Sequence, residues 1–560
     1  MFYNFDRRIL HQFWQIGKIY WFSSEKQQAI ALFILLLFIS FFSTGLLVAV
    51  SVFLGELESS LAALDQNRFF QAIGIFVVIL LIGIPIVSLK VYLQGKISLF
   101  WRRYLTNHFI DRYLSARNFY YLTANTEIDN PDQRISEDIQ NFTQESLYFL
   151  IVFWDAILQL IAFSGILWRI YPPLMVFLII YAIAGTILTT TVFGKVLVNI
   201  NQEQLKREAD FRYGLIRMRD NSEAIAFYQG EVTESQELWQ RFLRVFSNYF
   251  RLIRWQLGLD VFQNSYRYIT FLLPTFILAP RILTGELEIG VSAQAGVSFQ
   301  SILISLGLIV SQFEQISALA AAVTRLDELQ DTILDLKNQG NNQSVNTLNR
   351  VEESYISFDN VTLQTPDSQR LIVENLSFTL NQGESLLIIG KSGVGKTSLL
   401  RAIAGLWYSG SGKITCPHTS RLLFLPQRPY MTLGSLQQQL LYPNLNHEVT
   451  ESQLLEILQK VNLLSLIEKG ITLDTIEDWG RILSVGEQQR LAFARLILHA
   501  PEYAILDEAT SALDEANQSK MYSLLQQTNI NYISVGHRSS LREFHQRILE
   551  LQSMGSFLLN

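Results

Sequence analysis

Residues 386–400 have the sequence LLIIGKSGVGKTSLL, an apolar strand followed by a glycine-rich turn and the start of a helix. This is the order of a P-loop, in which glycines let the backbone approach phosphate groups and a helix N-terminus attracts the anion. The lysine of such a loop reaches the β- and γ-phosphates, and the hydroxyl after it binds Mg²⁺. The residues predicted to bind ATP in this way are Gly390, Lys391, Ser392, Gly393, Val394, Gly395, Lys396, Thr397 and Ser398.

A second apolar strand, YAILDE at residues 503–508, ends in two acids. Because the carboxyl ends of parallel strands meet at one edge of a sheet, both carboxylates are expected beside the nucleotide. Asp507 is the predicted Mg²⁺ ligand, directly or through water, together with Thr397. Glu508 is the predicted general base that polarises the attacking water. The alternative is an acidic pair on a solvated edge.

Between these strands lies LSVGEQQR, residues 483–490, where Ser484 and Gly486 offer a hydroxyl and backbone N–H groups at a helix start. With this motif the second part of the chain resembles the nucleotide-binding domain of the ATP-binding cassette (ABC) family. The resemblance implies that Ser484, Gly486 and Glu487 close over ATP held by another subunit. It also implies that Gln427, in LPQRP, takes part in catalysis and in metal binding. His537, in SVGHR, corresponds to a histidine that contacts the γ-phosphate, and residues 511–514 correspond to the D-loop.

Two positions depart from the family pattern. Val485 stands in the signature where glycine is commonest, which leaves Ser484 and Gly486 in place. The aromatic residue that usually stacks on adenine is absent from its expected place, which has the sequence TLQTPD at residues 362–367. Adenine is then expected to rest on an aliphatic surface or on a residue from elsewhere in the chain.

The first part of the chain contains long apolar runs. Of all 560 residues, 49% are hydrophobic and 17% are charged, whereas soluble domains carry about a quarter charged residues. A bilayer-spanning helix needs roughly 20 apolar residues, and windows of that size occur repeatedly before the P-loop. They cover residues 29–54, 70–94, 146–170, 173–199, 266–284 and 294–317. Six such runs exceed what one soluble core could bury.

The predicted fold class is therefore an α-helical six-span transmembrane domain followed by an α/β P-loop ATPase domain. The resemblance implies an exporter-like, type IV arrangement of the spans. The predicted domains are an N-terminal interfacial helix at 1–28, the transmembrane domain at 29–334, a polar linker at 335–353 and the nucleotide-binding domain at 354–560. Aromatic residues favour the interfacial helix, with simple packing as the alternative. These aromatic residues are Phe13, Trp14, Tyr20 and Trp21.

Charge sets further limits. Lysines and arginines gather before the first window, after the second and after the fourth, so both termini are expected in the cytoplasm. The net charge is −6, so the chain lacks the strongly basic surface that is typical of nucleic-acid binders. The single cysteine, Cys416, excludes an intrachain disulfide and a cysteine-rich metal site.

The loop after the second window contains DNPDQRISED, residues 129–138. This stretch and residues 208–231 resemble one subgroup of ABC proteins: the SbmA/BacA-type peptide transporters, their YddA-like relatives and the peroxisomal acyl-CoA half-transporters. An Asn-Pro pair starts a helix, and Arg134 and Asp138 lie one turn apart on it, which predicts a charged face that docks on a cassette. The alternative is a helix cap with a solvated ion pair. The predicted coupling residues are Asn130, Pro131, Asp132, Arg134 and Asp138.

Polar residues at membrane depth usually face a bundle interior or a water-filled cavity. Helix–helix hydrogen bonding is the alternative for the serines and glutamines. The candidates for a substrate pathway are Asp155 and Gln159 in the third window, Arg267 in the fifth, and Ser298, Ser301, Ser305 and Gln312 in the sixth.

Together these features predict an ATP-driven transporter in a bacterial inner membrane, using ATP and Mg²⁺. One cassette per chain implies a dimer, either a homodimer or a heterodimer. The resemblance implies cargo such as cobalamin, peptides or acyl-CoA-like amphiphiles, and it leaves the direction open. An ATP-gated channel or signalling membrane protein is the rival from another class. No role with nucleic acid is expected.

Overall fold

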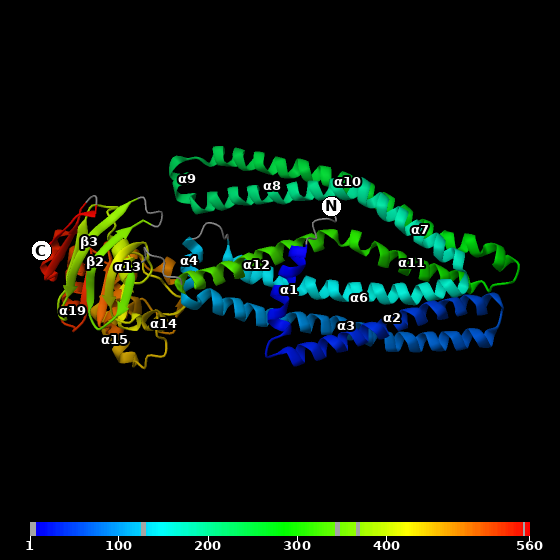
Figure 1. The fold of residues 1–560 in the computed structure, drawn as a ribbon, viewed down its shortest axis with the longest axis horizontal. Helices are drawn as coiled ribbons and strands as arrows, with labels where there is room; N and C mark the ends of the chain where they lie inside the picture. The colour runs from blue at the N-terminus through cyan, green and yellow to red at the C-terminus, as the bar shows by residue number, and fades with distance from the viewer. Residues whose placement is uncertain (1–6, 125–129, 342–347, 366–369, 553–554) are drawn as a thin grey trace. The chain divides into compact units, whose positions relative to one another are not determined.

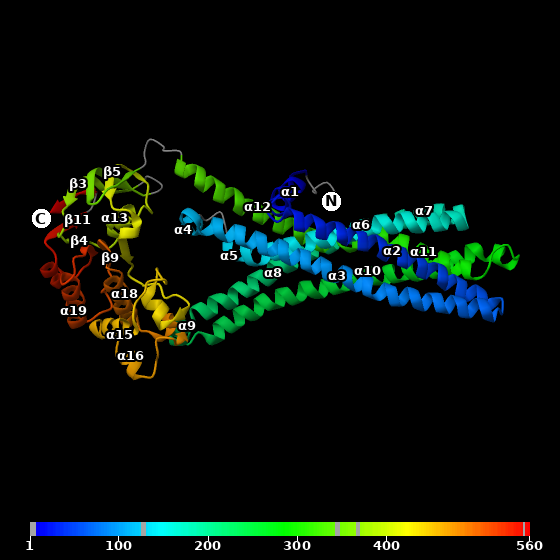
Figure 2. The same cartoon turned by 90° about the horizontal axis from the view of Figure 1, so that it is seen from below.

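The computed structural model of the chain describes residues 7–124, 130–341, 348–365, 370–552 and 555–560. The chain divides into two compact units, Met1–Gly340 and Asn341–Asn560. In the described residues the regular elements of the first unit are all helical, whereas the second unit combines strands and helices (Figure 1, Figure 2). The expected fold class, a helical membrane region followed by an α/β ATPase domain, is confirmed.

Long helices dominate the first unit. In chain order they are α2 (Lys26–Ala62), α3 (Gln66–Leu114), α6 (Ile139–Ile170), α7 (Pro172–Leu188), α8 (Lys195–Asp220), α10 (Glu231–Leu283), α11 (Gly290–Ser311) and α12 (Phe313–Asn341). Shorter elements are α1 (Arg7–Trp21), η2 (Ser115–Arg117), α4 (Asn118–Ala124), α5 (Pro131–Gln133), η3 (Arg134–Asp138), η4 (Thr189–Gly194) and α9 (Ser222–Tyr228).

Five helical stretches of the described chain are long and apolar enough to cross a membrane. They are Lys26–Ala62, Gln66–Thr123, Pro131–Ile170, Pro172–Asp220 and Gly290–Leu308. The predicted window 266–284 is helical as the last part of α10 but does not belong to this group. Its apolar run is broken by Arg267, Pro274, Pro280 and Arg281.

The surface of these helices is unusually apolar. Leu81 is 68% exposed, Ile84 64% and Leu272 72%, and many other large side chains on α2, α3 and α10 are similarly open. An apolar surface of this extent marks contact with lipid or with another protein. The first unit is therefore built for a bilayer, as the composition of the sequence indicated.

The amphipathic helix α1 packs against the bundle along one face. Tyr20 is buried, and its ring stacks on Trp101 of α3 at 6.0 Å, while Phe13 lies 5.5 Å from Phe142 of α6. Trp14 on the other face is 55% exposed. Tyr20 and Phe13 therefore pack against other helices, which was the alternative interpretation of these aromatic residues. Trp14 is exposed, as expected for a helix at the membrane interface.

The second unit contains two main sheets. The larger has strand order β12-β11-β4-β10-β9-β6, with all neighbours parallel except β12. Its strands are β4 (Leu386–Gly390), β6 (Leu422–Leu425), β9 (Tyr503–Asp507), β10 (Asn531–Val535), β11 (Arg547–Leu551) and β12 (Phe557–Leu559). The smaller sheet, of order β1-β5-β2-β3, comprises β1 (Asn349–Glu352), β2 (Ile356–Gln364), β3 (Leu371–Leu380) and β5 (Gly410–Cys416).

Helices and short elements complete this unit. They are α13 (Lys396–Ile403), η5 (Thr419–Arg421), β7 (Gly434–Ser435), α14 (Leu436–Leu441), α15 (Glu451–Lys460), α16 (Ser465–Glu468), β8 (Ile476–Glu477), α17 (Trp479–Ile482), α18 (Val485–His499), α19 (Glu515–Gln526) and η6 (Ser539–Phe544). Within the predicted linker 335–353, helix α12 extends to Asn341 and β1 occupies Asn349–Glu352. Residues 342–347 lie outside the described part of the chain.

His545 is a buried histidine that lies between η6 and β11 in the sequence. Its Nδ1 lies 2.7 Å from the carbonyl oxygen of Leu541, and the rings of Tyr522 and Tyr532 lie 5.5 and 5.1 Å away. Its Nε2 has no hydrogen-bond partner in the described part of the chain. Burial lowers the pKa of His545 from 6.5 to about 4.

We expect this histidine to make the second unit acid-sensitive. Since its pKa is lower in the folded state, its contribution is complete above pH 6.5 and is lost as the pH falls towards 4. The loss between pH 7 and pH 5 should be about 2 kcal/mol. Hydrogen exchange of the β10 amides in the full chain, corrected for intrinsic exchange, would measure it. His545→Gln should flatten the dependence, whereas His418→Gln, at an exposed site, should leave it; an unchanged slope in His545→Gln would contradict the assignment.

Candidate functional site

The sheet topology gathers the predicted nucleotide-site residues at one edge. Strands β4, β10, β9 and β6 are adjacent and parallel, so the segments that follow their carboxyl ends lie at the same edge of the sheet. The P-loop follows β4, His537 follows β10, Glu508 follows β9 and Gln427 follows β6. Four segments distant in the sequence therefore meet.

The P-loop takes a conformation that requires glycine. Gly395 has φ +113°, and a Cβ there would collide with the side chain of Ile372. Gly390 has φ +145°, and a Cβ there would lie 2.5 Å from the carbonyl oxygen of Leu551. Lys396 is 6% exposed, and its Nζ donates to the carbonyl oxygens of Gly390 and Lys391 at 2.9 and 3.1 Å. Burial lowers the pKa of Lys396, an effect that Glu508 and Asp507 oppose.

An oxygen pair suited to a hard cation stands beside the loop. The hydroxyl of Thr397, on α13, donates to Oδ1 of Asp507, at the end of β9, over 3.2 Å. Burial raises the pKa of Asp507, and the hydrogen bond from Thr397 opposes that rise. Hydroxyl and carboxylate oxygens are the ligands that Mg²⁺ prefers. The donor set therefore fits the predicted metal.

Glu508 is held by two other predicted site residues. Nε2 of Gln427 donates to one carboxylate oxygen at 3.0 Å, and Nε2 of His537 lies 3.0 Å from the other. Because a carboxylate only accepts, this arrangement requires the proton on Nε2 of His537. Glu508 itself has φ +49°, a left-handed conformation that is costly for this residue and typical of functional sites.

The signature segment forms a helix start of its own. Ser484 is the N-cap of α18, and it forms a capping box with Glu487. Oγ of Ser484 accepts from the backbone nitrogen of Glu487 at 3.3 Å and donates to its carboxylate at 2.7 Å. At Gly486 a Cβ would approach the carbonyl oxygen of Ala512 to 3.1 Å, which favours glycine there. In the described part of the chain, the side-chain hydrogen bonds of Ser484 and Glu487 are with each other.

Two buried polar residues that sequence reasoning missed position these segments. Gln489, fully buried on α18, donates to the carbonyl oxygen of Gln427 and to Ser511 Oγ, and it accepts from the backbone nitrogen of Ala512, at 3.0, 3.2 and 3.0 Å. Arg495, one to two turns further, donates to the carbonyl oxygens of Gln439 and Tyr430 at 2.6 and 2.7 Å. In the sequence, these two residues could have been found because each is a polar residue among apolar neighbours on one helix.

The segment where the resemblance would place an adenine-stacking aromatic residue is described only in part. Strand β2 ends at Gln364, whose carbonyl oxygen accepts from the indole of Trp407 at 2.9 Å. Residues 366–369 lie outside the described part of the chain, so the predicted segment 362–367 is described only to 365.

The predicted coupling residues Arg134 and Asp138 are buried, although the sequence suggested an exposed charged face. Arg134 and Asp138 belong to the π-helical η3 and are only 4% and 1% exposed. Arg134 Nη1 donates to the carbonyl oxygen of Arg325 at 2.7 Å and lies 3.3 Å from Glu328. Asp138 binds the guanidinium of Arg325 through both oxygens, at 2.7 and 2.5 Å. These two side chains thus join η3 to α12 and do not form an exposed charged face. Asn130, with φ +41°, and Pro131 and Asp132 begin α5.

The predicted pathway residues fall into two groups. Asp155 pairs with Lys90 and accepts from Ser40, and Gln159 accepts from Ser305 at 3.4 Å. Ser298 and Ser301 instead donate to carbonyl oxygens one turn earlier on their own helix, at 2.8 and 2.9 Å. Arg267 is exposed on α10, and Gln312 is the C-cap of α11. Among these residues the structure joins Gln159 of α6 to Ser305 of α11, whereas the partners of Asp155, Lys90 and Ser40, were not predicted.

Comparison with known proteins agrees with this architecture. Residues 16–283 match the family ABC transporter transmembrane region 2, and residues 373–511 match the family ABC transporter. An uncharacterized ABC transporter ATP-binding protein of Synechocystis is 43% identical over 94% of this chain and 80% of its own length. The chloroplastic ABC transporter D family member 2 of Arabidopsis thaliana is 38% identical over 97% of this chain and 86% of its own. The mouse lysosomal cobalamin transporter ABCD4 is 31% identical over 99% and 96%.

A helical membrane unit fused to a P-loop ATPase with these motifs defines an ABC transporter, an integral membrane protein that binds ATP and couples its hydrolysis to transport. More narrowly, the chain belongs to the D-family ABC half-transporters, which carry one membrane region and one ATPase domain per chain.

Proposed function

We propose that two copies of this chain form a homodimeric transporter in a bacterial inner membrane, with both termini in the cytoplasm. The transporter uses ATP and Mg²⁺ to move a bulky hydrophilic or amphipathic molecule. The observation that carries the proposal is the placement of Glu508 between Gln427 and His537, beside the Thr397–Asp507 pair. A regulatory nucleotide site would not need a complete hydrolytic set.

Each residue has a role in hydrolysis. Glu508 accepts the proton of the attacking water, and Gln427 and His537 orient its two oxygens. Lys396 and the P-loop amides bind the phosphates, so their charge is balanced as the bond to the γ-phosphate breaks. Thr397 and Asp507 would hold Mg²⁺, with Gln427 as the third predicted ligand, and a cation held there would supply positive charge opposite the phosphates.

The signature segment supports the proposed homodimer. Ser484 lies exposed at the N-terminus of α18, where backbone N–H groups can bind an anion. We propose that it binds the γ-phosphate of ATP held by the P-loop of the second copy. Because this chain carries P-loop, base, signature and histidine, two copies would complete two equivalent sites.

Cobalamin or a peptide is the proposed cargo, and import and export both remain candidates. One relative is named as a lysosomal cobalamin transporter and is similar over almost its whole length. An acyl-CoA or another lipid-like amphiphile is the second candidate. The apolar cavity of the membrane unit favours that alternative.

Uptake by proteoliposomes tests the proposal. Vesicles containing the full-length protein and internal or external ATP are given radiolabelled cyanocobalamin, a labelled apolar peptide or a labelled acyl-CoA. We expect one of them to accumulate above its external concentration, or to be expelled against a gradient, only with ATP. Movement down a gradient alone, at the same rate in Glu508→Gln, would show an ATP-gated channel and overturn active transport.

A further inference from the structure

An ion pair lies among the apolar helices of the membrane unit. The ammonium of Lys90, on α3, contacts the carboxylate of Asp155, on α6, and the hydroxyl of Ser40, on α2, donates to the same carboxylate. The side chains of Lys90 and Asp155 are 15% and 18% exposed, and Ser40 is fully buried. All three helices are apolar enough to cross a membrane. Charged groups at such a depth are costly and usually serve a function.

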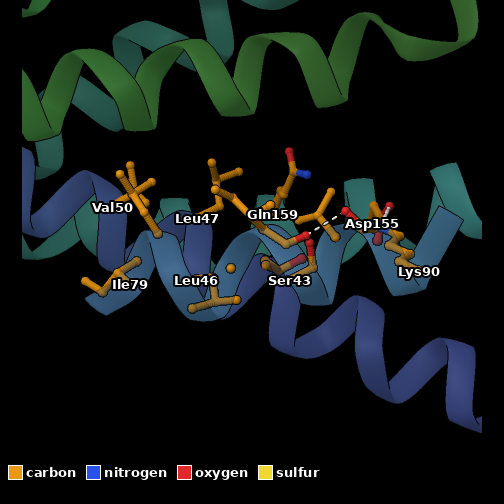
Figure 3. A pocket seen from close by; sticks show the side chains of 14 residues that line it. Ser43, Leu46, Leu47, Val50, Ile79, Lys90, Asp155 and Gln159 are labelled. Atoms are coloured by element: carbon orange, nitrogen blue, oxygen red, sulfur yellow. Dashed lines mark hydrogen bonds and ion pairs between the residues drawn. The ribbon is translucent and has the colours of Figure 1, made fainter. Parts of the chain in front are cut away.

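The pair stands at one end of an open cavity of about 400 Å³ between α2, α3 and α6, whose wall residue Ile84 is 64% exposed. That volume is within the roughly 300–1,000 Å³ of pockets that bind small molecules. Figure 3 shows Lys90 and Asp155 side by side at one end, with Val50 and Ile79 at the other. Leu46, Leu47 and Ile84 add to the apolar walls between them. The cavity thus has one charged end and mostly apolar walls, to which Ser43, Thr44 and Ser88 add hydroxyl groups.

The charged end sets the chemistry of a ligand. An anionic head group would bind Lys90 but meet the carboxylate of Asp155, and a cationic head group would bind Asp155 but meet the ammonium of Lys90. Either would leave one membrane-embedded charge without its partner, which is unfavourable. A head group with both charges close together satisfies both side chains. An apolar chain attached to it would contact the apolar side chains of the walls.

We propose that this cavity binds a single-chain zwitterionic amphiphile of the lysophosphatidylethanolamine type. Its phosphate lies on Lys90, its ammonium on Asp155, and its chain lies along Leu46, Leu47 and Val50. The inference rests on the proposed function only where it makes this molecule a cargo, and it then favours the second candidate named above, a lipid-like amphiphile. Binding itself needs no ATP.

Gly83 provides a clean way to fill the cavity. It lines the wall, and a Cβ placed there meets only Leu46 Cδ1, at 3.8 Å, which is an ordinary contact. Gly83→Leu should therefore occupy the cavity without moving the backbone. Lys90→Gln combined with Asp155→Asn removes both charges and leaves no unpaired ion. Glu203→Gln, in the Glu203–Arg207 pair of α8 outside the cavity, is the matched control.

Native mass spectrometry of the full-length protein in detergent, without ATP, measures binding. The probes are lysophosphatidylethanolamine, lysophosphatidylglycerol and an alkyltrimethylammonium of equal chain length. We expect the zwitterionic lipid to bind at least tenfold more tightly than the other two. Gly83→Leu and the double variant should each weaken it at least tenfold, and Glu203→Gln should not change it.

Three results would overturn the inference. One is equal affinity for all three probes, and another is unchanged affinity in Gly83→Leu. The third is binding of trileucine with free termini together with no binding of the lysolipid, which would assign the cavity to peptides. Because the assay contains no ATP, a failure of the proposed transport would leave its outcome unaffected, so the two failures are distinguishable.

Discussion

Replacing Glu508 by glutamine should lower ATP hydrolysis at least about 100-fold, because removal of a general base typically costs 10²–10⁴-fold in rate. Glutamine keeps the size of the side chain and its contact with Gln427, but it cannot accept a proton from water. ATP binding should persist, since Lys396 and the P-loop are untouched. Phosphate release by the full-length protein in nanodiscs measures turnover, and binding of a fluorescent ATP analogue measures retention of the nucleotide.

Glu502→Gln is the matched control for this experiment. Glu502 lies in the same unit, close to β9, and is 49% exposed in an ion pair with Arg421. An exposed pair of this kind contributes little, roughly 0–1 kcal/mol, so turnover should stay near that of the unaltered protein. Retention of more than a tenth of the turnover by Glu508→Gln would refute the assignment of Glu508 as the base.

Arg325→Met should destabilise the membrane unit by about 3 kcal/mol, since removing one partner of a buried ion pair costs 3–5 kcal/mol. Asp138 is 1% exposed and loses the guanidinium that binds both of its oxygens. The lower end of the range applies because Arg325 is 44% exposed. Unfolding of the full-length protein in mixed micelles with increasing dodecyl sulfate measures the change.

A double variant separates the ion pair from the general effect of mutation. Asp138→Leu with Arg325→Met removes both charges, and most of the lost stability should return, to within about 1 kcal/mol. A second control is Glu237→Gln, in the exposed Glu237–Arg241 pair of α10, which should have little effect. If the single and double variants were equally unstable, the pair would not be what holds η3 to α12.

Much of the ATP site could be predicted from local sequence. A glycine-rich turn between an apolar strand and a helix has few alternative structures. At Gly395 φ is +113° and a Cβ would collide with Cγ2 of Ile372, so glycine is strongly favoured there. The acids after β9 were likewise expected beside the P-loop, because parallel strands end together. The 3.2 Å contact between Thr397 and Asp507 agrees with that expectation.

Other features could not be predicted because they depend on packing between distant segments. Arg134 and Asp138 lie one turn apart, which suggested an exposed pair, yet they bind groups of α12 that are 191 and 187 residues away in the sequence. Lys90 was hidden in an apolar window, and only the approach of α3 to α6 gives it Asp155 as a partner. Gln489 was one glutamine of two in the signature, and its burial decides which one joins Gln427 to Ser511.

The sequence by itself determined that this protein is an ATP-driven half-transporter, since motifs of contiguous residues carry the phosphate chemistry and apolar runs carry the bilayer signal. Tertiary structure decided which charges are buried together, where a cavity lies and which residues orient Glu508. The physical reason is the separation along the chain over which each property is decided. Backbone conformation at glycine and hydrophobic length are local properties, whereas the stability of a buried charge depends on partners that only the folded chain brings within hydrogen-bonding distance.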